Sequence, residues 1–109
     1  MGLLLSAGPK VAMLQRNPEA WPAHNNLGNV LFQKEQVDEA IIECQKAIEI
    51  YPNHAKAHNN LGTALLKNRR LPEAIAQFQE AVRLDPTNTS AQNNLRIAQA
   101  MAKQRANQK

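Results

Sequence analysis

Asparagine is the polar residue whose placement in this chain is most informative, because it recurs as adjacent pairs 34 residues apart. The pairs are Asn25-Asn26, Asn59-Asn60 and Asn93-Asn94. A carboxamide offers two N–H donors and an oxygen acceptor, so it can pair with both the N–H and the C=O of an extended peptide. Asparagine is also a poor helix former, so its recurrence within helical segments needs a reason. We therefore expect the second members, Asn26, Asn60 and Asn94, to form a ladder that holds peptide main chain; the alternatives are a hydrogen bond between helices and a side chain that is simply solvated.

Histidine and cysteine are the other candidates for chemistry. His24 and His58 occupy equivalent positions, and Cys44 is the single cysteine of the chain. A metal site needs three or four converging ligands, and a cysteine on an apolar stripe commonly behaves as a small buried hydrophobic residue. The chain contains no Gly-rich phosphate loop, no HExxH and no G-x-S-x-G. We expect structural histidines, no metal, no cofactor and no enzymatic activity.

The elements that carry these residues follow from the same repeat. The run Ala-His-Asn-Asn-Leu-Gly occupies residues 23–28 and again 57–62. The same step separates Pro18, Pro52 and Pro86. Apolar residues such as Leu27, Val30 and Leu31 recur at three and four positions, which is helical spacing. A fixed period of this length is typical of stacked repeat proteins. We expect helices near residues 20–34, 38–51, 55–68, 72–85 and 89–106.

The repeat resembles the tetratricopeptide repeat (TPR) pattern, W-x₂-L-G-x₂-Y…A-x₃-F…P. The matching positions of the first unit are His24, Leu27, Gly28, Leu31, Ala40, Cys44 and Pro52. Those of the second unit are His58, Leu61, Gly62, Leu65, Ala74, Phe78 and Pro86. Histidine replaces tryptophan, leucine replaces tyrosine and, in the first unit, cysteine replaces phenylalanine. The resemblance covers residues 18–106 and implies an all-α solenoid of antiparallel helix pairs.

The resemblance also implies a division of the chain into four parts. They are an N-terminal segment or remnant helix at 1–17, TPR 1 at 18–54, TPR 2 at 55–88 and a C-terminal capping helix with a basic tail at 89–109. Gly28 and Gly62 lack a Cβ, so we expect the second helix of each pair to press against the first there. Arg96 holds the corresponding place in the third unit, where we expect no further helix to pack. We expect Asn53 and Asn88 to cap the helices that follow them.

In TPR proteins the first helices of the pairs line a concave groove, so the resemblance implies a scaffold that binds an extended peptide segment. The residues expected to line this groove are Asn25, Asn26, Asn29, Phe32, Lys56, Asn59, Asn60, Thr63, Leu66, Lys67, Asn93 and Asn94. The asparagine ladder resembles that of the TPR superhelix in O-linked N-acetylglucosamine transferases.

TPR cochaperones use a different device, a dicarboxylate clamp for acidic peptide ends. Two clamp asparagines have counterparts in Asn29 and Asn60. The three cation positions of the clamp hold Asn25, Ser90 and Asn94. A clamp without cations loses its charge-assisted hydrogen bonds, so we expect no strong preference for a terminal carboxylate.

The net charge of +4 is unevenly distributed and bears on the partner. Residues 21–54 hold two lysines and five acidic residues, a balance of −3, whereas residues 89–109 hold four basic residues and no acidic one, a balance of +4. Four basic residues provide only weak electrostatic attraction for nucleic acid. They also interact favourably with the negative C-terminal end of a helix dipole. No apolar run approaches the roughly 20 residues that cross a bilayer. We expect a protein or peptide partner rather than nucleic acid or membrane, and a cytoplasmic location.

A structural role is the alternative function. The chain would then self-associate through a poorly covered front face, or form part of a longer TPR array in a larger protein. The residues expected to contribute are Trp21, Leu3, Leu4 and Leu5. Exposed apolar patches of this kind often mark interfaces between proteins.

Overall fold

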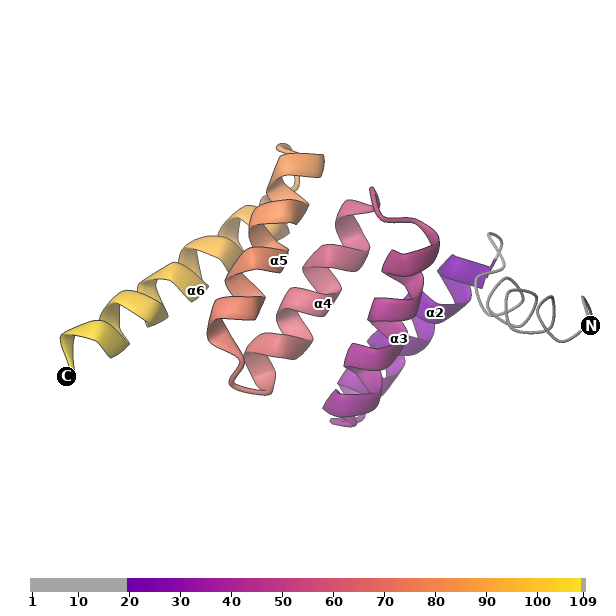
Figure 1. Ribbon diagram of the computed structural model, residues 1–109, viewed down its shortest axis with the longest axis horizontal. Helices are drawn as coiled ribbons and strands as arrows, with labels where there is room; N and C mark the ends of the chain where they lie inside the picture. The colour runs from indigo at the N-terminus through magenta and orange to yellow at the C-terminus, as the bar shows by residue number, and fades with distance from the viewer. Residues whose placement is uncertain (1–19, 109) are drawn as a thin grey trace, which may run out of the picture.

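The computed structural model describes residues 20–108. Over this range the chain forms the helices α2 (Trp21–Gln33), α3 (Val37–Ile50), α4 (Ala55–Lys67), α5 (Leu71–Leu84) and α6 (Thr89–Asn107). Each helix runs back along the one before it, and the stack proceeds from α2 at one end to α6 at the other (Figure 1). The predicted all-α solenoid of helix pairs is confirmed, and every predicted helix end lies within one residue of the observed one.

Small residues set the distance between the helices of each pair. The α2–α3 and α4–α5 pairs pack most extensively, while α4 also packs on α3 and α6 on α5. Alanines at Ala40 and Ala74 are fully buried where the pairs meet. A Cβ added to Gly28 would lie 2.7 Å from Sγ of Cys44, and one added to Gly62 would lie 2.5 Å from the ring of Phe78. The predicted close approach at both glycines is therefore confirmed.

The third unit differs from the first two at the position of the repeat glycine, as the sequence predicts. Arg96, which replaces the glycine, is exposed and donates a hydrogen bond from Nη2 to Oδ1 of Asn93, 3.0 Å away on the same helix. Its helix, α6, runs for 19 residues, compared with 13 in α2 and in α4. Among the described residues, α6 is thus the last element of the stack and covers α5.

The helix caps confirm one prediction and correct another. Asn88 accepts a hydrogen bond from the backbone N–H of Ala91 at 3.1 Å, as predicted for the cap of α6. The predicted cap at Asn53 is wrong, because Nδ1 of His54 accepts the bond from the backbone N–H of Ala57 at 3.2 Å. In the repeat register Asn88 aligns with His54, which immediately precedes the first turn of α4, whereas Asn53 lies one residue too early to reach it.

The cap at His54 makes stability depend on pH. Burial, with smaller contributions from the charges of Lys56 and His58, lowers the pKa of His54 below its ordinary value. The native state therefore favours the neutral ring, whose Nδ1 can accept the capping bond. This stabilisation is complete above the unfolded pKa of about 6.5 and is lost progressively as the pH falls from there through the lower pKa of the folded state.

We accordingly expect the melting temperature to fall between pH 7.5 and pH 5, and to fall less in a His54→Asn variant. Asparagine keeps the capping oxygen, as Asn88 does in α6, but does not titrate in this range. Thermal unfolding followed by circular dichroism at both pH values measures the difference. An equal fall in the two proteins would show that His54 does not cause the pH dependence.

Candidate functional site

A hollow between α2 and α4 gathers several of the predicted groove residues. Its volume is about 210 Å³, and it is lined by Gly28, Asn29, Phe32, Cys44, Asn60, Thr63 and Ala64. Asn29, Phe32, Asn60 and Thr63 are among the residues that the sequence places in the groove. The structure thus brings together four of the predicted residues from two helices that are separated by a complete helix in the sequence.

The remaining lining residues, Gly28, Cys44 and Ala64, were not predicted from the sequence, which indicated packing roles for Gly28 and Cys44 only. Cys44 and Ala64 are each 1% exposed, so they lie beneath the surface of the hollow. The signal that could have found this feature is the replacement of the family phenylalanine by Cys44, since a smaller side chain leaves space above it.

The thiol of Cys44 has low reactivity in this position. Burial, reinforced by the negative charge of Glu43, raises the pKa of Cys44 to about 11. The thiol is therefore protonated at neutral pH, and a protonated thiol is a poor nucleophile and metal ligand. The expectation that Cys44 behaves as a buried apolar residue is confirmed by its position.

The asparagine pairs bridge the first helices of successive repeats. Nδ2 of Asn60 donates to Oδ1 of Asn25 at 2.9 Å, and Nδ2 of Asn94 donates to Oδ1 of Asn59 at 3.0 Å. The interhelical hydrogen bond, given above as an alternative to a peptide ladder, is therefore what the structure contains at both places. Each bridge uses one of the two N–H groups of its donor, so Asn60 and Asn94 retain donor and acceptor capacity for other partners.

Asn25 is the most covered of the predicted groove residues. It is 8% exposed, and its side-chain oxygen already accepts from Asn60. A carboxamide covered in this way positions Asn60, and whether Asn25 also meets a ligand stays a prediction. The equivalent residues are more exposed along the stack, since Asn59 is half-buried and Asn93 is exposed.

A short polar network continues the bridge toward α6. Nδ2 of Asn59 donates to Oγ of Ser90 at 3.2 Å, and the hydroxyl of Thr63 donates to the backbone oxygen of Asn59 at 2.9 Å. Ser90 and Asn94 hold two of the places that are cationic in a dicarboxylate clamp. In this chain they belong to an uncharged network of amides and hydroxyls, and no charged side chain is among the residues that line the hollow.

The other predicted groove residues lie around the hollow rather than in it. Asn26, Lys56, Lys67 and Asn93 are exposed, and Leu66 is half-buried against the core. They are on the three helices α2, α4 and α6 that carry the bridges, and whether they meet a ligand stays a prediction.

Trp21 lies in an intramolecular cluster. Its ring is 4.2 Å from that of His54 and 5.4 Å from that of Tyr51, measured between centroids. Trp21 therefore ties the start of α2 to the turn between α3 and α4, which the sequence did not indicate. The other residues predicted for self-association, Leu3, Leu4 and Leu5, lie outside the described residues, as does the segment 1–17.

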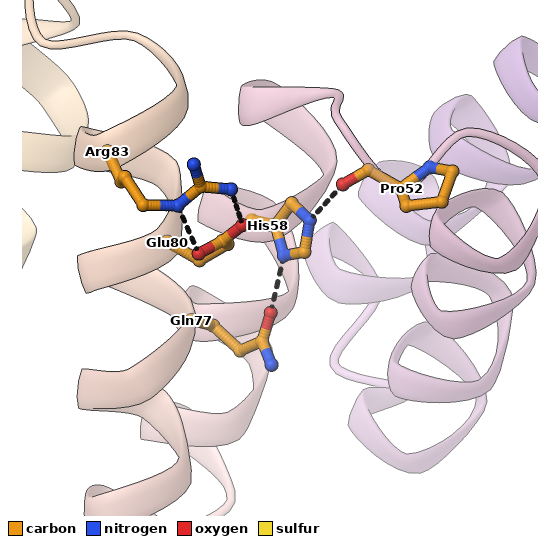
Figure 2. A network of polar contacts seen from close by, with 5 residues as sticks. All are labelled: Pro52, His58, Gln77, Glu80 and Arg83. Atoms are coloured by element: carbon orange, nitrogen blue, oxygen red, sulfur yellow. Dashed lines mark hydrogen bonds and ion pairs between the residues drawn. The ribbon is translucent and has the colours of Figure 1, made fainter.

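The two equivalent histidines are structural, as predicted. Nε2 of His58 donates to the backbone oxygen of Pro52 at 2.6 Å, and Nδ1 lies 2.7 Å from Oε1 of Gln77. Figure 2 shows the ring held between the turn before α4 and the side chain from α5, beside the ion pair of Arg83 with Glu80. The His58 contacts therefore connect three elements of the stack.

His24 repeats this arrangement one unit earlier, with Nδ1 lying 2.7 Å from Oε1 of Glu43. Burial alone would raise the pKa of Glu43, but its contacts with His24 and Lys46 outweigh burial and hold the pKa below its ordinary value. Across residues 20–108, no three His, Cys, Asp or Glu side chains are grouped so that they could hold a metal ion. None of the helices in this range has the length and apolar character needed to span a membrane.

Comparison with known proteins establishes the family. A family model described as "Tetratricopeptide repeat" matches residues 19–87. The chain belongs to the tetratricopeptide repeat family. A search of curated protein sequences finds no match.

Solved TPR domains share the fold. The second TPR of Spaghetti (RPAP3), bound to HSP90 peptide SRMEEVD, has a TM-score of 0.77 at 22% identity, with 84% of each chain covered. The TPR2B domain of yeast Sti1, in a pHsp70 complex, has a TM-score of 0.76 at 27% identity, covering 82% of this chain and 71% of that one. The first TPR of Spaghetti, bound to the same HSP90 peptide, has a TM-score of 0.71 at 27% identity, covering 80% and 68%.

The bridges predict unequal roles for equivalent asparagines in this TPR protein. Asn25→Ala removes the buried acceptor of Asn60, and we expect a loss of about 1–3 kcal/mol in the free energy of unfolding. Asn93→Ala changes the matching exposed residue, and we expect a change within about 0.5 kcal/mol. Urea denaturation of both variants measures the difference. Equal effects at the two sites would contradict the structural role of the bridge.

Proposed function

We propose that this chain is a non-catalytic TPR scaffold that binds an extended peptide segment of a partner protein along α2, α4 and α6. TPR 1 at 18–54 and TPR 2 at 55–88 would form the groove, and 89–109 the capping helix. The observation that carries the proposal is the hollow between α2 and α4, where the carboxamides of Asn29 and Asn60 stand above an apolar floor. The peptides bound to the Sti1 and Spaghetti TPR domains support the same use of the fold.

The proposed ligand is an internal, uncharged stretch of main chain rather than an acidic C-terminus. The HSP90 peptide on Spaghetti ends in Glu-Glu-Val-Asp, which requires cationic partners. Here the corresponding places hold Asn25, Ser90 and Asn94, which bond to other asparagines. Amides can pair with peptide N–H and C=O groups without any charge.

The expected affinity is modest. Each hydrogen bond contributes about 0.5–1.5 kcal/mol net, and two repeats offer only a few such bonds. A dissociation constant of 1 μM corresponds to about −8 kcal/mol, and a few amide contacts with one apolar side chain at about 1.5–3 kcal/mol fall short of that value, so we expect micromolar affinity at best. Tighter binding would need further repeats or several linked sites.

Self-association or membership of a longer array is the second candidate. Leu27 and Val30 on α2 are each 45% exposed, whereas the equivalent Leu61 and Ala64 on α4 are 4% and 1% exposed because α3 packs over them. The face of α2 that carries Leu27 and Val30 is therefore apolar, as is the equivalent face of α4 that packs against the preceding repeat. Sedimentation that gives a monomer mass at high micromolar concentration would remove self-association as a function.

The peptide proposal is tested with the Asn29→Ala variant. Asn29 is exposed on α2 and lines the hollow, so the substitution should leave stability within about 0.5 kcal/mol. We expect the best peptide from a library of acetylated, amidated nonapeptides to bind the variant about two- to tenfold more weakly, as measured by isothermal titration calorimetry.

The matched control is Asn53→Ala, which changes an exposed asparagine in the turn between α3 and α4. Its affinity for the same peptide should equal that of the unaltered protein. If the peptide keeps its affinity in Asn29→Ala and also in an Asn29→Ala/Asn60→Ala double variant, the binding site lies elsewhere.

A further inference from the structure

The two TPR units differ at one core position that faces the groove helices. Phe78 on α5 is fully buried, and its ring occupies the space over Gly62, with a ring carbon 2.5 Å from where a Cβ would lie. The equivalent residue on α3 is Cys44, which is also buried and approaches Gly28 in the same way. A thiol is much smaller than a phenyl ring, so the first unit fills less of the space between its helices.

The hollow is where that space remains. Its lining includes Gly28, Cys44 and Ala64 on the inner side, with Asn29, Phe32, Asn60 and Thr63 completing the wall. Its volume of about 210 Å³ exceeds the roughly 150 Å³ of an apolar cavity that holds benzene. The hollow can therefore contain a leucine, methionine or phenylalanine side chain.

The chemistry of the wall selects an uncharged occupant. The only ionisable group among the lining residues is the Cys44 thiol, whose pKa is raised to about 11 and which is therefore neutral. The hydroxyl of Thr63 donates to the backbone oxygen of Asn59, and Asn60 donates to Asn25, so both polar groups are already partly satisfied. A charged side chain placed here would lose water and gain no partner of opposite charge.

We propose that the hollow floored by Cys44 is a specificity subsite that receives one large apolar side chain, leucine, methionine or phenylalanine, from the bound peptide. This inference rests on the proposed peptide-binding function. Asn29 and Asn60 hold the main chain beside the inserted side chain, and the Cys44 position sets how deep that side chain reaches. The second unit has no equivalent space over Gly62, because the ring of Phe78 fills it.

The substitution that tests the subsite is Cys44→Phe. The ring would occupy the hollow from below, in the place that Phe78 has against Gly62, so the second unit is the precedent for a folded variant. Cys44→Ala is the opposite change at the same residue, because it leaves the hollow open and slightly larger. Cys44→Leu, with a smaller side chain than phenylalanine, provides a second closing variant if Cys44→Phe is unstable by circular dichroism.

The probe is a positional-scanning library of acetylated, amidated nonapeptides in which each position is fixed in turn as Leu, Met, Phe, Ala, Asp or Lys. We expect the unaltered protein to favour Leu, Met or Phe over Ala at one position by about tenfold, and to reject Asp and Lys there. The exposed control Asn53→Ala should leave this preference unchanged, and Cys44→Ala, which enlarges the hollow, should keep it or sharpen it toward the larger side chains. Cys44→Phe or Cys44→Leu should reduce it to less than about threefold while weak binding through the main chain persists.

The outcomes separate the two proposals. If the unaltered protein binds library peptides but its preference is unchanged in the closing variants, the subsite inference is wrong and peptide binding stands. If the preferred residue is charged, the subsite inference is also wrong. If no peptide in the library binds the unaltered protein, both the subsite and the proposed function are overturned.

Discussion

The close approach of the two helices in each pair is the constraint on which the rest of the structure depends. At Gly28 and Gly62 a single added carbon would come within 3 Å of the facing side chain. Fully buried alanines, such as Ala40 and Ala74, allow the same approach from the second helix. Because the pairs are held this tightly, each exposed face of α2, α4 and α6 occupies a defined place relative to the next. The hollow and the asparagine bridges follow from that placement.

Hydrogen bonds between carboxamides connect the first helix of one unit to the first helix of the next. Asn25–Asn60 and Asn59–Asn94 join residues 35 positions apart, one more than the repeat length. The donor is thus the second asparagine of one pair and the acceptor the first asparagine of the preceding pair. A bridge of this kind fixes the register of the first helices and holds Asn60 at the hollow, where it still has one N–H group to offer. The same residue therefore serves both the stack and the candidate site.

The fold could be predicted almost completely from the sequence, because helical spacing, glycine placement and the proline step all repeat. The helix ends, the capping role of Asn88 and the structural histidines agree with the structure. The cap was wrongly placed at Asn53 because its position was counted from Pro52. The 34-residue repeat instead aligns the capping Asn88 with His54. The bridge at Asn25 could not be predicted, since the exposure of one amide depends on which side chain of the next unit reaches it. The depth of the hollow depends on the volume that Cys44 leaves empty between three helices, which residue periodicity does not reveal.

The central proposal is that a peptide lies across α2 and α4 at the hollow. The most direct test is the ¹H–¹⁵N spectrum of the labelled protein, titrated with the best peptide of the nonapeptide library. We expect the largest shifts at the side-chain amides of Asn29 and Asn60 and at the backbone amides of Thr63 and Ala64. Resonances on the outer side of α3, such as that of the exposed Ile42, should stay in place. Shifts concentrated around Ile42, with the hollow unchanged, would contradict the proposal.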